Sequence, residues 1–106
     1  MPKVCWTDKG EASLLSIARY VIEQNQSRQR GLDLIEKVEQ KALNFATFPE
    51  AGTSRPDLGP GLRCFPVDKH LVIYRPIEDG IAVILFAHGH QDVRTVVERL
   101  CEEQTY

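Results

Sequence analysis

The feature that most constrains this fold is a pair of apolar stripes at helical spacing, separated by a break of only three residues. The period predicts two amphipathic helices. The break is Asn25-Gln26-Ser27, in which Ser27 is a candidate N-cap for the second helix. Pro49 ends that helix, because proline cannot continue the hydrogen-bond ladder. So short a link predicts an antiparallel hairpin with one shared apolar face. The stripes consist of Leu14, Ile17, Ala18, Val21 and Ile22, then Leu32, Ile35, Val38, Ala42 and Phe45.

The residues before the hairpin predict a short strand and a helix start. Lys3–Trp6 is the candidate strand, and it stops at Thr7-Asp8. Asp8 followed three positions later by Glu11 is a capping-box pattern, which satisfies free amides at the beginning of a helix. We therefore expect Asp8 to be the N-cap of the first helix.

Residues after the hairpin predict a sheet. An irregular loop rich in Gly and Pro covers residues 51–61. Three β-rich runs follow it, namely Leu62–Val67, Leu71–Arg75 and Ile81–His88. Asp79-Gly80 before the last run is typical of a type I′ hairpin turn. Asp92 is a candidate cap for a final helix.

This order of elements predicts one α+β domain over residues 1–106. The expected sequence is β-α-α-β-β-β-α, with the helical hairpin packed on a small, mainly antiparallel sheet. A single domain also fits the length of 106 residues.

Composition bounds the function classes. Thirteen Lys and Arg against fifteen Asp and Glu give a net charge of −2, which argues against direct nucleic-acid binding by this chain alone. No apolar run is long enough to cross a membrane, and no secretory signal is recognisable. Cys5, Cys64 and Cys101 fit reduced thiols in a cytoplasmic protein. GxxxxGK(S/T), HExxH, GxSxG and CxxC patterns are absent, and we expect no cofactor.

Two weaker patterns could carry chemistry. His88 and His90 share a face if the strand continues, and with Asp92 they could approach a metal, but three or four ligands are needed and we expect none. The cations Arg63 and Arg75, with Lys69 and Arg55 nearby, could converge on one anion. Ion pairing with Glu78, Asp79 or Asp57 is the equally weighted alternative.

The middle of the chain resembles the ParE branch of the RelE/ParE toxin superfamily. That branch carries a P-x-x-G-x-x-R-x-x-L segment followed by G-L-R, matched here by residues 49–63. Further matches are Phe65-Pro66-Val67, Leu71-Val72-Ile73-Tyr74-Arg75, Glu78-Asp79-Gly80-Ile81, His88-Gly89 and Asp92. The resemblance covers roughly residues 4–100.

The resemblance implies the toxin of a type II toxin–antitoxin system of the plasmid-stabilisation kind. A ParD-like antitoxin would wrap over the helical hairpin and sheet, forming a hetero-oligomer, and DNA gyrase would be the target. Candidate antitoxin-binding residues are Leu15, Ile22, Leu34, Val38, Phe45, Leu71 and Ile73. Candidate target-binding residues are Arg63, Arg75, His88, His90 and Asp92.

The alternative within the superfamily is a RelE-like, ribosome-dependent mRNA endonuclease, in which Arg63 would act with His88 or His90. RelE-like sequences place an Arg after the last strand and a Tyr in the final helix, where this chain has Gln91 and Val96-Val97. The net charge also favours a protein target. Because ParE-like sequences usually carry an Arg where Gln91 stands, a homologue with lost activity is a third reading.

Overall fold

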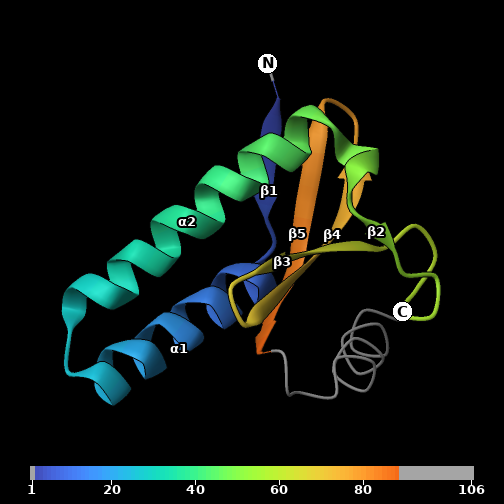
Figure 1. Cartoon of the computed structure of the whole chain (residues 1–106). Helices are drawn as coiled ribbons and strands as arrows, with labels where there is room; N and C mark the ends of the chain where they lie inside the picture. The colour runs from blue at the N-terminus through green and yellow to red at the C-terminus, as the bar shows by residue number, and fades with distance from the viewer. Residues whose placement is uncertain (1, 89–106) are drawn as a thin grey trace.

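A helical hairpin and a five-stranded sheet form two layers in the computed structural model, which describes residues 2–88 (Figure 1). The elements are β1 (Lys3–Trp6), α1 (Asp8–Asn25), α2 (Arg28–Thr47), the 3₁₀ turn η1 (Pro49–Ala51), β2 (Thr53–Ser54), β3 (Arg63–Val67), β4 (His70–Ile77) and β5 (Gly80–His88). The strand order is β1-β5-β4-β3-β2. Among the strands of residues 2–88, β1 runs parallel to its neighbour β5, and the other pairings are antiparallel. The predicted α+β class is confirmed.

The hairpin forms through side-chain caps and a close helix crossing. The Ser27 hydroxyl accepts a hydrogen bond from the Arg30 amide at 3.4 Å, so the predicted cap of α2 is confirmed. The prediction that Asp8 caps α1 is wrong by one residue, because the Thr7 hydroxyl accepts from the Gly10 amide at 3.0 Å. Gly31 lets α2 approach α1, since a Cβ there would overlap the Ile22 side chain.

The last strand, β5, is apolar at nearly every position because both of its faces are covered, and it contains a β-bulge. Ile73 pairs with Leu85, but Tyr74 pairs with Val83, so Ile84 is an extra residue in β5. A bulge reverses the alternation of side chains. The bulge places the consecutive residues Ile84 and Leu85 on one face, while Val83 and Phe86 lie on the other.

The first turns of α1 are hydrogen-bonded to this bulge. The Thr7 hydroxyl donates to the Val83 carbonyl at 2.8 Å, and the Phe86 amide donates to the Ser13 hydroxyl at 2.9 Å. Gly10 sits at the contact, where a Cβ would collide with the Val83 carbonyl. These bonds fix the angle of the hairpin on the sheet.

Two apolar cores lie on opposite faces of the sheet. The larger one, under the helices, contains Leu14, Leu34, Val38, Ala42, Ala46, Phe65, Val67, Val72, Tyr74, Ile81, Val83 and Phe86. The smaller one contains Leu58, Leu62, Cys64, Ile73, Leu85 and Ala87. The irregular loop therefore packs as a cover, through Leu58 and Leu62, on the face away from the helices.

Three expectations need correction or fall outside the described chain. The structure adds strand β2, which pairs with β3. The turn before β5 has Glu78-Asp79 as its central pair, and only Asp79 has a positive φ of 68°, so it is not type I′. The expected final helix lies outside residues 2–88. Within that range, neither helix is apolar enough over a sufficient length to span a bilayer.

Candidate functional site

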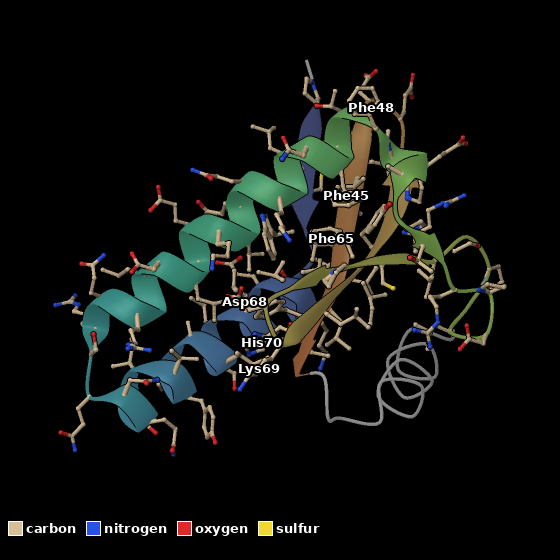
Figure 2. The ribbon with its side chains drawn as sticks, viewed as in Figure 1. Phe45, Phe48, Phe65, Asp68, Lys69 and His70 are labelled. Atoms are coloured by element: carbon tan, nitrogen blue, oxygen red, sulfur yellow. The ribbon has the colours of Figure 1, made fainter. Side chains whose placement is uncertain are left out.

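An open groove separates the linked ends of the two helices from the turn between β3 and β4. Its volume is about 580 Å³. Figure 2 shows Asp68, Lys69 and His70 together at this turn, beside the hairpin. The lining residues are Val21 and Asn25 of α1, Arg30, Asp33, Leu34 and Lys37 of α2, and Asp68, Lys69 and His70. The groove thus joins segments that are far apart in sequence.

Among the described residues, three cationic side chains and two anionic ones line this groove. The Lys37 ammonium contacts both carboxylate oxygens of Asp68, at 3.0 and 3.2 Å, and this ion pair ties α2 to the turn. The Asp33 carboxylate accepts a hydrogen bond from the side-chain amide Nε2 of Gln29 at 2.8 Å. Within the described chain, no ion pair involves Arg30 or Lys69. The groove can therefore receive carboxylates at its rim while Val21 and Leu34 offer apolar contact.

His70 forms the sheet side of the groove. Its ring stacks on Phe86, with centroids 5.1 Å apart and an angle of 27° between the planes. It stands opposite His88 in the register of β4 and β5. The stack fixes the imidazole as a wall of the groove.

A second arrangement holds the turn after α2. The Tyr74 hydroxyl donates to the Pro49 carbonyl at 2.7 Å and accepts from the Gly52 amide at 3.0 Å. The Arg63 guanidinium donates through Nη1 to the carbonyls of Gly52, at 2.8 Å, and Glu50, at 3.1 Å. Burial raises the pKa of Tyr74, although the hydrogen bond from Gly52 opposes this. The hydroxyl therefore stays protonated and able to donate.

Comparison with known proteins decides the family. The sequence model of the family described as the ParE toxin of type II toxin–antitoxin systems, parDE, matches residues 4–93. This chain belongs to the ParE toxin family. Toxin ParE3 of Caulobacter vibrioides is 28% identical over 93 residues, covering 88% of this chain and 92% of that protein. A solved structure described as a chromosomal ParDE TA system from P. aeruginosa has a TM-score of 0.69 at 18% identity, covering 83% of this chain and 96% of that one, which supports the shared fold.

The arrangement of Tyr74 and Arg63 gives the ParE-like sequence segment a structural explanation. Pro49 and Gly52 supply the carbonyl and amide that Tyr74 binds, and Arg63 binds two carbonyls of the same turn. Gly52 has to lack a side chain, because a Cβ would overlap the Tyr74 hydroxyl. The segment therefore secures a turn of this ParE-family fold.

The expected convergence of Arg63 and Arg75 is wrong. Arg63 pairs with Tyr74 across β3 and β4, so the two share the face under the helices. Arg75 is the next residue and lies exposed on the opposite face, since side chains alternate along a strand. The alternative, ion pairing with an acid, is confirmed for Arg55. Its guanidinium makes a bidentate contact with the Asp57 carboxylate, at 2.9 and 3.0 Å. That hydrogen bond raises the pKa of Arg55.

The histidine and aspartate candidates cannot be assembled into a site here. His88 ends β5, but its side chain, with His90 and Asp92, lies outside the described residues. Among residues 2–88, no group of three His, Cys, Asp or Glu side chains could hold a metal ion.

The expected antitoxin-binding residues divide into three groups. Leu15 is half exposed, Ile22 is partly exposed, and Leu34 forms the groove floor. Val38 has no exposed surface, and Phe45 stacks on Phe65 with ring centroids 4.3 Å apart. Leu71 and Ile73 belong to the smaller core, on the face away from the hairpin. These residues therefore lie on the helices and on both faces of the sheet, and their role in binding an antitoxin stays a prediction.

Sequence reasoning missed the charged wall of the groove. The sequence places Lys69 in a possible cationic set with Arg63 and Arg75, but it gives no sign that Lys69 lies with Lys37, Asp68 and His70 along one groove. Lys37 and Asp68 are 31 positions apart, so their contact leaves no local signal. The clustering of three polar residues in so short a turn is the signal that could have directed attention to it.

Proposed function

We propose that this ParE-family chain is a cytoplasmic toxin that is neutralised by a ParD-like antitoxin and inhibits DNA gyrase. Membership of the ParE toxin family supports the assignment as a toxin with an antitoxin partner. The observation that carries the proposed antitoxin binding is the groove beside the hairpin, with its apolar floor and excess of cations. An acidic, amphipathic antitoxin segment is the complementary ligand, and the two proteins would form a hetero-oligomer.

The groove offers two kinds of contact to such a segment. Apolar side chains on one face of the segment would cover Val21 and Leu34. Carboxylates on its flank would pair with Arg30 and Lys69, whose side chains have no acidic partner within residues 2–88. The Lys37–Asp68 pair would then be a fixed part of the wall, since both of its charges are already compensated.

A protein target fits the described cations better than RNA cleavage. RNA cleavage requires several basic groups aimed at one reacting phosphate. Arg63 is engaged with backbone carbonyls, and Arg75 lies on the other face of the sheet. Arg63 and Arg75 therefore do not converge as the nuclease reading needs, which supports inhibition by binding to gyrase as the proposal.

Induced expression in a bacterial host tests the target. We expect filamentation, the SOS response and loss of plasmid supercoiling, all reversed by co-expression of the antitoxin encoded beside the toxin. Immediate arrest of translation with cleaved mRNA would contradict gyrase as the target. Absence of any growth effect would favour a homologue with lost activity.

A charge reversal tests the antitoxin groove separately. Lys69→Glu should leave toxicity intact and weaken neutralisation, because it places an anion where the antitoxin presents anions. The matched control is Arg19→Glu, an equal charge change at an exposed position of α1 that does not line the groove. Equal neutralisation of both variants would show that the antitoxin binds elsewhere.

A further inference from the structure

A large exposed aromatic side chain stands at the end of the hairpin opposite the groove. Phe48 follows α2 and is 69% exposed, more than the other large apolar side chains that are exposed in residues 2–88 (Figure 2). Its backbone is held on both sides: its amide donates to the Asn44 carbonyl at 3.2 Å, and its carbonyl accepts from the Ala51 amide at 2.9 Å. The next residue, Pro49, is bound by Tyr74. The aromatic ring is therefore presented from a fixed turn.

Two shallow hollows adjoin Phe48. One, of about 460 Å³, is lined by Thr47, Phe48, Pro49, Glu50, Ala51, Pro76 and Ile77. The other, of about 310 Å³, is lined by Pro2, Ala46, Thr47, Pro49, Ile77, Asp79 and Gly80. They share Thr47, Pro49 and Ile77 and so form one continuous surface, which we call the Phe48 surface. Each of the two hollows has apolar lining residues and can receive an apolar side chain from a partner.

The charge of the Phe48 surface is negative. Glu50 and Asp79 line it, and Glu78 lies exposed beside Asp79. No Lys or Arg of the described chain is in either lining. The last turn of α2 also has no basic residue, so the partial negative charge of the helix end is not offset there. A complementary ligand is cationic.

We propose that the Phe48 surface docks a segment of a partner protein in which lysine or arginine residues flank an apolar side chain. The apolar side chain would fill a hollow against Phe48 and Ile77, and the cations would pair with Glu50 and Asp79. The partner is not a second copy of this chain related by two-fold symmetry, because that contact would bring the same carboxylates together.

This surface is separate from the proposed antitoxin groove. Leu34, on the groove floor, and Phe48 are 14 positions apart along α2, or about 21 Å at the rise of a helix. The groove selects an acidic segment, whereas the Phe48 surface selects a basic one. Both can be occupied at once, and the inference stands whether or not the antitoxin and gyrase proposals hold.

Peptide selection tests the proposal with the purified full chain. The probe is a library of random twelve-residue peptides displayed on phage, with the Phe48→Ser chain as the counter-bait. Enriched peptides should carry lysine or arginine around a Leu, Ile or Met. As synthetic peptides they should bind wild type about tenfold or more tightly than Phe48→Ser. Circular dichroism verifies that the variant is folded, as expected for an exposed position.

A second pair of variants separates charge from packing. Glu50→Gln combined with Asp79→Asn should weaken the same peptides severalfold and reduce the salt dependence of binding. Asn tolerates the positive φ at position 79. The matched control is Tyr20→Ser, which removes an aromatic ring that is 55% exposed on α1, and binding should not change.

Each other outcome overturns the proposal. Enriched peptides that are acidic, equal binding by Phe48→Ser, or no enrichment over the counter-bait would show that no basic segment is recognised. A wild-type dimer in sedimentation velocity that Phe48→Ser converts to a monomer would assign the surface to a second copy instead.

Discussion

Replacing Tyr74 with phenylalanine should strongly destabilise the fold while leaving its shape intact. The hydroxyl makes two hydrogen bonds, to the Pro49 carbonyl and from the Gly52 amide, and the second is buried. The bond to the Pro49 carbonyl contributes about 1 kcal/mol net, and the buried Gly52 amide left without a partner costs about 1–2 kcal/mol. The free energy of unfolding should therefore fall by roughly 2–3 kcal/mol.

Urea denaturation at 25 °C measures this loss. Trp6 is the single tryptophan and packs against the larger core, so its fluorescence reports on unfolding. With a slope of about 1.5 kcal/mol/M, the midpoint of Tyr74→Phe should fall by roughly 1.3–2 M. The control is Tyr20→Phe, because Tyr20 is exposed, and it should change stability by less than about 0.5 kcal/mol. A loss under about 0.5 kcal/mol for Tyr74→Phe as well would show that the two hydrogen bonds of the hydroxyl do not stabilise the fold.

The free energy of unfolding should depend on pH differently in the wild type and in Tyr74→Phe. Burial raises the pKa of Tyr74 above the ordinary value of 10.0. Above pH 10 the unfolded chain therefore loses a proton that the folded chain retains, and the free energy of unfolding of the wild type decreases as pH rises. Phenylalanine has no proton to lose. The stability gap between wild type and Tyr74→Phe should therefore narrow above pH 10, and a constant gap would contradict the assignment.

Three further substitutions test the packing described above, each by urea denaturation. Gly10→Ala should lower the free energy of unfolding by more than about 2 kcal/mol. The new Cβ would overlap the backbone carbonyl of Val83, which cannot move without disturbing the bulge. An unchanged urea midpoint would disprove this contact. Gly31→Ala should lower the free energy of unfolding by less, since its Cβ would overlap side-chain atoms of Ile22, which can shift, and would stand 3.1 Å from the Ala18 carbonyl. A loss equal to that of Gly10→Ala would contradict this distinction. Lys37→Ala should lower the free energy of unfolding by under about 1 kcal/mol, and by less in about 0.5 M salt, because its ion pair with Asp68 is half exposed. A larger loss that does not depend on salt would show that Lys37 stabilises the fold by something other than this ion pair.

Most of the hairpin and sheet could be predicted because their causes are local. Apolar spacing and the Ser27 cap define the α1–α2 hairpin, and β1 has the predicted bounds. β2 could not be predicted, because two residues carry no periodicity and become a strand only by pairing with β3. The start of α1 was displaced by one residue because Thr7 and Asp8 are both good caps, and the contact of Thr7 with β5 decides between them.

The candidate site was less predictable, because its contacts join distant segments. Arg63 matched a family position, but only the fold shows that its guanidinium binds carbonyls 11 and 13 residues earlier. Arg75 could be placed on a strand, while its face depended on the pairing of Arg63 with Tyr74. The ion pair of Lys37 and Asp68 depends likewise on where α2 crosses the turn.

The most direct test of the proposed function combines this chain with purified DNA gyrase and relaxed plasmid. We predict that the chain blocks supercoiling and traps cleaved plasmid, and that an excess of the antitoxin restores supercoiling. Gyrase that supercoils plasmid at the same rate with and without the chain, while translating ribosomes given the same chain accumulate cut mRNA, would contradict the proposal.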